Sequence, residues 1–266
     1  MNKRSRITVA QFVEELLSQG RYTFVRKEAV LRLEGTPASV YMALYRLQKA
    51  GRLAMPRAGF YVIVDPQHRA AGILPPEWFV HDLMAFLKRP YYVGLLSAAQ
   101  LHGAAHHPPQ EFQVVVPGRR LRPLTSGNVR IAFFGKGPFR RAGIEDRKTP
   151  TGSLRASAPE TTAWDLVRYP RAAGGLDHVV TVLSELSENL DSKRLRETAI
   201  RHGDPLVAQR LGHLLDTLGH PELTEGLSAW VKDAPIRRLD PSLPWRKAAV
   251  DRKWRLAVNA NPEPEA

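Results

Sequence analysis

The chain has 266 residues and no cysteine, which excludes disulfide bonds, thiolate nucleophiles and Cys-based zinc or iron–sulfur sites. Its 39 Lys and Arg residues against 26 Asp and Glu residues give a formal net charge of +13, and such a surface attracts polyanions, above all nucleic acid. No apolar run approaches the roughly 20 residues that span a bilayer, and no secretory segment follows the basic start. A cytoplasmic protein without membrane contact is therefore expected.

The pattern of residues predicts an α+β protein with two domains. Its length favours two domains, and Asp65-Pro66 marks a break between a short first region and a longer second one. The predicted domains are residues 1–72 and 73–258. The polar, Pro-bearing segment 259–266 is expected to be a flexible tail.

The first region is predicted to contain three helices followed by two strands. Apolar periodicity and capping signals place the helices at residues 8–19, 24–33 and 36–50, and the strands at 52–55 and 59–64. Thr36 and Pro37 favour a helix start, because threonine can cap the helix and proline at the first position loses no hydrogen bond. This order of elements is typical of a winged helix-turn-helix, a DNA-binding fold.

The third predicted helix has two unlike faces. At about 100° per residue, the inward face holds Val40, Ala43, Leu44, Leu47 and Gly51. The opposite face carries no acidic residue, as a helix between two phosphate backbones requires. The predicted DNA-binding residues are those of this face, Ala38, Ser39, Met42, Tyr45, Arg46 and Lys49, together with Arg57 at the tip of the wing.

Two alternatives stay open for this face. Arg46 could donate to a guanine edge or to a phosphate, and the cations could also be solvated residues of a protein-binding winged helix. Residues 1–70 contain twelve Lys and Arg residues against five acids, Glu14, Glu15, Glu28, Glu34 and Asp65. This imbalance favours double-stranded DNA as the partner.

The second region is predicted to be a mixed α/β domain with several helices and a small sheet. Helices are expected at 76–88, 94–103, 161–167, 176–187, 192–202, 205–218 and 222–231, and strands at 112–117, 129–134, 152–156 and 253–258. Ser157 and Glu160 have the spacing of a capping box at the start of the third of these helices.

A basic stretch between residues 118 and 148 stands out in the second region. It is either a set of solvated loops or an electropositive face that meets nucleic acid. The candidate residues of this face are Arg119, Arg120, Arg122, Arg130, Arg140 and Arg141.

Three groupings that could suggest chemistry are better explained as structural. His102 and His106 have zinc-ligand spacing, but Gly103 and the following prolines end the helix between them. Residues 145–148 contain an Asp-x-Lys, yet residues 112–144 hold no Asp or Glu to complete a nuclease metal site, so a charged surface turn is expected. Glu160 and Asp165 do not lie on one helix face. No metal, cofactor or catalytic activity is predicted.

Two segments of the second region resemble motifs of a known family. Residues 91–103, YYVGLLSAAQLHG, resemble a segment in which a serine–alanine pair opens a helix that ends in His-Gly. Residues 156–166, ASAPETTAWDL, resemble a "SPERALLDLL" helix start, with Trp164 in place of a leucine. With the predicted winged helix, these segments are similar to AbiEi-type antitoxins of type IV toxin–antitoxin systems over residues 8–190. The last seventy residues match no motif of that family.

The resemblance implies a transcriptional autorepressor that binds inverted repeats in its promoter, as a monomer or weak dimer on DNA. It also implies that the C-terminal domain counters a nucleotidyltransferase-like toxin, without a need for direct contact. The alternative from another class is a nuclease-like enzyme with a winged-helix targeting domain, which would require a cluster of carboxylates in the folded second domain.

Overall fold

The computed structural model describes residues 7–105, 109–137, 139, 143–245 and 248–265. The chain divides into two compact units. Unit 1 comprises Met1–Tyr92, Gln110–Gly137 and Asp146–Arg155, and unit 2 comprises Val93–Pro109, Pro138–Glu145 and Ala156–Ala266. The N-terminal helices thus share a unit with strands of the second region, and the domain boundary after residue 72 stays a prediction.

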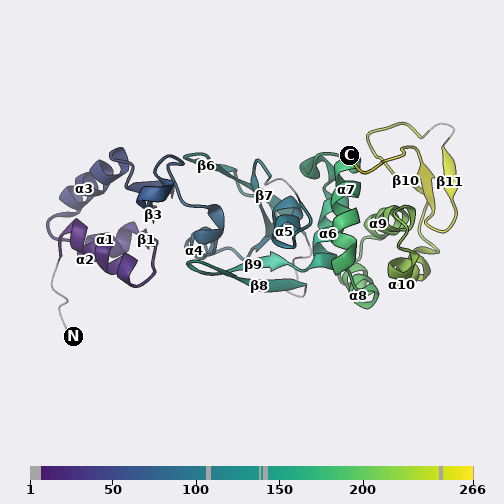
Figure 1. Cartoon of the computed structure of the whole chain (residues 1–266), viewed down its shortest axis with the longest axis horizontal. Helices are drawn as coiled ribbons and strands as arrows, with labels where there is room; N and C mark the ends of the chain where they lie inside the picture. Colours follow the sequence, from purple (N-terminus) through teal and green to yellow (C-terminus); the bar gives the residue numbers. More distant parts are fainter. Residues whose placement is uncertain (1–6, 106–108, 138, 140–142, 246–247, 266) are drawn as a thin grey trace. The chain divides into compact units, whose positions relative to one another are not determined.

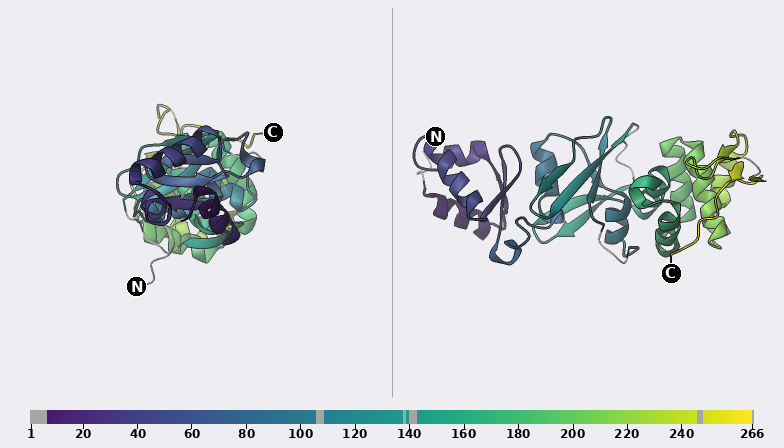
Figure 2. Two further views of the ribbon diagram at one scale, coloured as in Figure 1. Left: turned by 90° about the vertical axis from the view of Figure 1, so that its left-hand side faces the viewer. Right: turned by 90° about the horizontal axis from the view of Figure 1, so that it is seen from above.

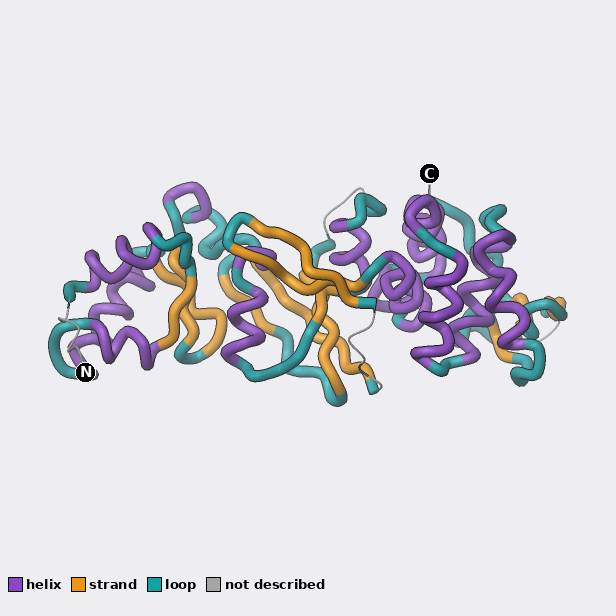
Figure 3. Tube along the Cα trace, turned by 90° about the horizontal axis from the view of Figure 1, so that it is seen from below, coloured by secondary structure: helices purple, strands orange, loops and turns teal. Residues whose placement is uncertain are grey.

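The N-terminal part of unit 1 has the element order of a winged helix-turn-helix (Figure 1). Its elements are α1 (Val9–Ser18), β1 (Thr23–Val25), α2 (Arg26–Arg32), α3 (Pro37–Lys49), β2 (Leu53–Arg57) and β3 (Phe60–Ile63). The strands form an antiparallel sheet in the order β1-β3-β2, and the three helices lie to one side of it (Figure 3).

Strand β1 is a difference from the sequence prediction, which places these residues at the start of a helix. Phe24 pairs with Tyr61 of β3, and their rings stack at 5.1 Å between centroids. Pairing and stacking with a partner distant in sequence outweigh the local helical pattern. As a result, α2 begins only at Arg26.

A mixed six-stranded sheet follows, in the order β6-β7-β5-β4-β9-β8. The elements of this part are η1 (Pro66–His68), η2 (Pro76–Trp78), α4 (Val80–Phe86), β4 (Tyr92–Val93), α5 (Leu95–Leu101), β5 (Phe112–Pro117), β6 (Leu124–Ser126), β7 (Val129–Lys136), β8 (Ile144–Thr149) and β9 (Gly152–Ser157). Strands β5 and β7 run parallel over six residue pairs, and Val114–Val116 in β5 are fully buried.

Strand β8 corrects the prediction that residues 145–148 form a charged surface turn. Ile144–Thr149 is a strand at one end of the strand order, with half-buried and exposed residues alternating along part of it. Charged side chains on an edge strand discourage pairing with other chains. The Asp-x-Lys of this segment therefore belongs to a sheet edge.

Unit 2 consists mainly of helices, with a small sheet at the C-terminal end of the chain (Figure 2). Its further elements are α6 (Pro159–Arg168), η3 (Pro170–Ala173), α7 (Leu176–Leu186), η4 (Ser187–Asn189), α8 (Ser192–His202), α9 (Pro205–Thr217), α10 (Pro221–Val231), β10 (Arg237–Arg238), β11 (Ala249–Asp251) and β12 (Leu256–Val258). In the sheet β10-β12-β11, β10 and β12 are parallel, whereas β11 and β12 are antiparallel. The predicted strand 253–258 is shortened to its last three residues.

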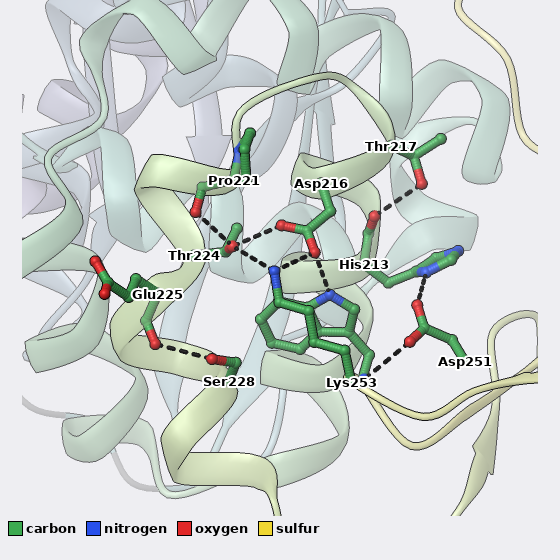
Figure 4. Close-up of polar contacts among 10 residues, drawn as sticks. His213, Asp216, Thr217, Pro221, Thr224, Glu225, Ser228, Asp251 and Lys253 are labelled. Atoms are coloured by element: carbon green, nitrogen blue, oxygen red, sulfur yellow. Dashed lines mark hydrogen bonds and ion pairs between the residues drawn. The ribbon is translucent and has the colours of Figure 1, made fainter.

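A polar cluster around Asp216 joins α9, α10 and the segment between β11 and β12 (Figure 4). The carboxylate accepts hydrogen bonds from Thr224 Oγ1 at 2.6 Å, Lys253 Nζ at 2.5 Å and Trp254 Nε1 at 2.7 Å. Burial alone would raise the pKa of Asp216, but these three hydrogen bonds and the Lys253 charge hold it below its usual value. The cluster therefore fastens the end of the chain to the helices.

The segment after β12 is held against α7. The backbone N–H of Glu263 donates to Asp177 and that of Glu265 donates to Thr181 Oγ1. The sequence predicts a flexible tail, whereas the described residues 259–265 lack helix and strand but make these contacts. Among the described residues, no helix combines the length and the apolar character needed to cross a membrane.

Candidate nucleic-acid interface

Helix α3 begins at a tight turn. Gly35 has φ of +96°, a conformation that favours glycine, and a Cβ there would overlap the Ser39 hydroxyl. Thr36 caps the helix by accepting from the Ser39 backbone N–H at 3.2 Å, and Pro37 occupies the first turn. The predicted start of the helix is therefore confirmed in its capping details.

One face of α3 anchors it to the N-terminal core. Val40 and Leu44 are buried in a cluster with Phe12 and Leu33, and half-buried Leu47 packs against the same cluster. Burying a Val or Leu side chain contributes about 1.5–3 kcal/mol. This packing fixes which face of the helix turns outward.

The opposite face of α3 is open to solvent. All six predicted α3 residues are exposed: Ala38, Ser39, Met42, Tyr45, Arg46 and Lys49. Met42 and Tyr45 keep 53% and 48% of their surface accessible, unusual for large apolar side chains. The predicted division of the helix into inward and outward faces is thus present, whereas the binding role of the outward residues stays a prediction.

Two pairs of an aromatic ring and a cation flank this face. The Arg26 guanidinium lies 4.2 Å from the ring centre of Tyr41, and Lys49 Nζ lies 5.5 Å from that of Tyr45. The sequence pattern alone does not select Tyr41 or Arg26. Helical spacing places Tyr41 next to Met42, but its contact with Arg26 of α2 requires the tertiary fold.

Two acids of α1 and α2 are paired with arginines. Arg21 contacts Glu28 through two bonds of 2.9 Å, and Arg32 donates to Glu15 at 2.6 Å. The hydrogen bond to Glu15 raises the pKa of Arg32, so the guanidinium stays charged. Arg46 and Lys49 of α3 remain with no acidic partner among the described residues.

Arg57 lies at the end of β2, next to the hairpin turn as predicted, but it is half-buried. The turn itself is tied to α2, since the Arg26 backbone N–H donates to the Gly59 carbonyl at 2.8 Å. The Arg57 Nε atom is shielded from solvent. A contact from this residue would therefore use only the end of its guanidinium, and we expect a smaller contribution than from α3.

The basic stretch of the second region divides into unlike parts. Arg119, Arg120 and Arg122 are exposed in the loop between β5 and β6. Arg130 instead pairs with Glu111 at 2.6 Å. Arg140 and Arg141 lie outside the described residues.

The motif residues of unit 2 connect its elements. His102, at the end of α5, contacts the Ser157 carbonyl at 2.7 Å through Nε2, and the Ser157 hydroxyl contacts Thr162 Oγ1 at 2.7 Å. The predicted capping box is wrong: Ala158 is the N-cap of α6, and buried Glu160 accepts from the Asp191 backbone N–H at 3.2 Å. Glu160 thus supports the start of α8.

A cavity of about 240 Å³ in unit 2 gathers charges of both signs. Its lining includes three carboxylates, Glu145, Glu160 and Glu197, and two arginines, Arg194 and Arg201. Within the part of the chain that the structure describes, no three His, Asp or Glu side chains are placed to hold a metal ion. The cavity therefore gives no support to the nuclease-like alternative.

His106 of the predicted histidine pair lies outside the described residues.

The fold and the exposed face of α3 define the class: an α+β protein with a winged-helix element order and a second, mainly helical part. Residues 92–217 match the family model described as the AbiEi antitoxin C-terminal domain. Over these residues the chain is thus similar to the C-terminal domain of AbiEi-type antitoxins, components of toxin–antitoxin, or abortive infection, systems, and the resemblance is confirmed there. The family is not an enzyme family.

The comparison with solved structures supports the fold over nearly the whole chain. A crystal structure of the RV2827C protein from Mycobacterium tuberculosis superposes with a TM-score of 0.70 at 18% identity, covering 96% of this chain and 93% of that chain. At 18% sequence identity, the similarity shows a shared fold and nothing about function. The comparison with curated proteins found no match.

Proposed function

We propose that the chain is a DNA-binding transcriptional autorepressor as well as an antitoxin. In this proposal α3 enters the major groove of operator DNA in the cytoplasm, and the C-terminal domain counters a nucleotidyltransferase-like toxin. The toxin class and the inverted repeats in the promoter follow from the family resemblance. No catalytic step is assigned to the chain.

The observation that supports DNA binding most directly is the composition of the exposed α3 face. A helix that only covers its own core has no need to expose Met42 and Tyr45 beside Arg46 and Lys49. Acidic residues are missing from α3, and Glu15 of α1 and Glu28 of α2 are paired with arginines. Such a surface suits a groove walled by phosphates.

A gel-shift titration with duplex DNA from the region upstream of the chain's own gene tests the proposal. Replacing Arg46 and Lys49 together by Ala should lower the affinity on the order of 10- to 100-fold, because two cationic contacts to the duplex are lost. A variant with Lys193→Ala and Lys232→Ala, two exposed cations of unit 2, serves as the charge-matched control.

The α3 assignment fails if the Arg46→Ala, Lys49→Ala variant binds as tightly as the parent. Autorepression fails if the parent shows no preference for the upstream duplex over unrelated duplex DNA at the same salt concentration. In that case a winged helix that binds a protein partner is the better description of α3.

A further inference from the structure

The centre of the exposed α3 face is apolar. Ala38, Met42 and Tyr45 are spaced as i, i+4 and i+7, so neighbouring members of the row lie on the same side of the helix, about 5–6 Å apart. All three are exposed, and Met42 is the most accessible large apolar side chain of the helix. The core does not use this row.

The polar groups beside the row are few. The Ser39 hydroxyl donates to the Thr36 carbonyl at 2.8 Å within the helix cap, so it is engaged locally. The Lys49 ammonium lies over the Tyr45 ring, toward the C-terminal end of the helix. Arg46 follows Met42 by one turn, which places a second long donor on the same side of the helix as Met42.

Base edges in the major groove offer one apolar group to such a row. Guanine, cytosine and adenine present acceptors and donors there, whereas thymine also presents its C5-methyl group. The Ala and Met side chains of the row offer no hydrogen bond, so donors and acceptors of other bases placed against them stay without partners, which costs free energy on burial. A methyl group placed against the same row gains contact and loses no hydrogen bond.

We infer that α3 reads thymine, through contact of C5-methyl groups with Met42 and its neighbour Ala38, and that Arg46 supplies the polar contact beside them. This inference rests on the proposed function and specifies the base that the same site selects. Removing one buried methyl group lowers affinity about fourfold by hydrophobic transfer alone. Two such contacts would give a change of about 16-fold.

The test starts from a pool of duplex DNA with a randomised central segment, from which the full-length chain selects binders. Selected duplexes are then synthesised in two forms, with thymine or with uracil, which differ only in the C5-methyl group. We expect thymine at fixed positions of the selected sequences, and affinity about 4- to 16-fold lower for the uracil form. If the pool is not enriched in any sequence, the proposed function itself fails.

Met42→Ala identifies the side chain that makes the contact. Met42 is exposed and alanine favours helix, so this variant should fold. The expected result is that Met42→Ala shows a smaller difference between the thymine and uracil forms than the parent, because the contact with Met42 is lost and only that with Ala38 remains. Lys27→Ala, which alters an exposed residue of α2, should keep the full difference between the two forms.

Two results would overturn the inference while leaving DNA binding intact. One is a set of selected sequences bound equally well in the thymine and uracil forms. The other is a thymine preference that persists undiminished in Met42→Ala, which would assign the methyl contact to another part of the chain.

Discussion

Gly212 shows how a single residue can decide the packing of a distant segment. It lies inside α9, and a Cβ built on it would overlap three ring atoms of Trp254. The indole is fully buried and donates to Asp216, so it has no room to retreat. The glycine is needed here for space, since its backbone is helical.

Gly212→Ala is therefore expected to destabilise the protein. Overpacking of this kind costs about 1–3 kcal/mol, although alanine in a helix is favoured over glycine by roughly 1 kcal/mol. Urea denaturation followed by tryptophan fluorescence measures the net change in the free energy of unfolding. A decrease of that free energy is the expected sign.

Gly226→Ala provides the matched control, because it also replaces a glycine inside a helix. A Cβ there would lie 2.9 Å from Cδ and 3.3 Å from Cβ of Arg196, contacts that are less severe than those with the buried indole. This variant should therefore be clearly less destabilising than Gly212→Ala. If both variants change stability equally, Trp254 is not packed on α9 as described.

At the scale of elements, the Asp216 cluster links two helices and the last hairpin. Thr224 belongs to α10, whereas Lys253 and Trp254 lie in the turn between β11 and β12. A single carboxylate therefore connects three segments through hydrogen bonds to a charged acceptor, which are stronger than those between neutral groups.

The Asp216 cluster predicts a dependence of stability on pH. Because the pKa of Asp216 is lower in the folded chain, its stabilisation is fully present above the unfolded pKa, near 4, and is lost as pH falls through the folded pKa. Asp216→Asn should lower the free energy of unfolding at neutral pH, on the order of 2 kcal/mol. The variant should also lose less stability than the parent on acidification.

Denaturation series at several pH values measure both effects. Asp233→Asn changes an exposed carboxyl group after α10 and serves as the control for charge alone. Parallel stability curves for the parent and Asp216→Asn across the acidic range would show that the Asp216 carboxylate does not hold the hairpin.

Elements with long periodic patterns were predictable from the sequence, and short or charged ones were not. The helix 192–202 is found as α8 with its predicted bounds, because one apolar stripe and the following glycine mark it. Strand β6 has three residues and β8 carries four charged residues, so neither shows an alternating apolar pattern. Their pairing depends on neighbours that are distant in sequence.

The same limit applies to the candidate site. Helical spacing alone selects the outward residues of α3, because that face needs only the period of one helix. The contact between Arg26 and Tyr41 joins two helices, and the half-burial of Arg57, beside a hairpin turn that is hydrogen-bonded to α2, arises only in the folded chain. Glu160 is a further example of a contact that the sequence pattern does not reveal, since its hydrogen-bond partner Asp191 is 31 residues away.

At the scale of the whole molecule, the net charge of +13 exceeds what the α3 face accounts for. Arg46 and Lys49 are two cations, and the loop between β5 and β6 exposes three more, Arg119, Arg120 and Arg122. The family resemblance assigns no role to this loop. Salt dependence of DNA binding can show whether its charges contact phosphates, because each neutralised phosphate releases counterions.

We predict that replacing Arg119, Arg120 and Arg122 together by Gln weakens binding to all duplexes alike and leaves the sequence preference unchanged. Each lost phosphate contact reduces the slope of log affinity against log salt by about one, so a reduction of up to about three is expected. Filter binding or fluorescence anisotropy over a series of salt concentrations gives this slope. A triple variant with Lys193→Gln, Lys232→Gln and Arg237→Gln has the same net charge and should keep the parental slope, because its changes lie in exposed parts of unit 2.

Equal slopes for the parent and both variants would mean that the loop is solvated and that α3 and its surroundings make all the phosphate contacts. Equal reductions in both variants would instead indicate a general effect of net charge.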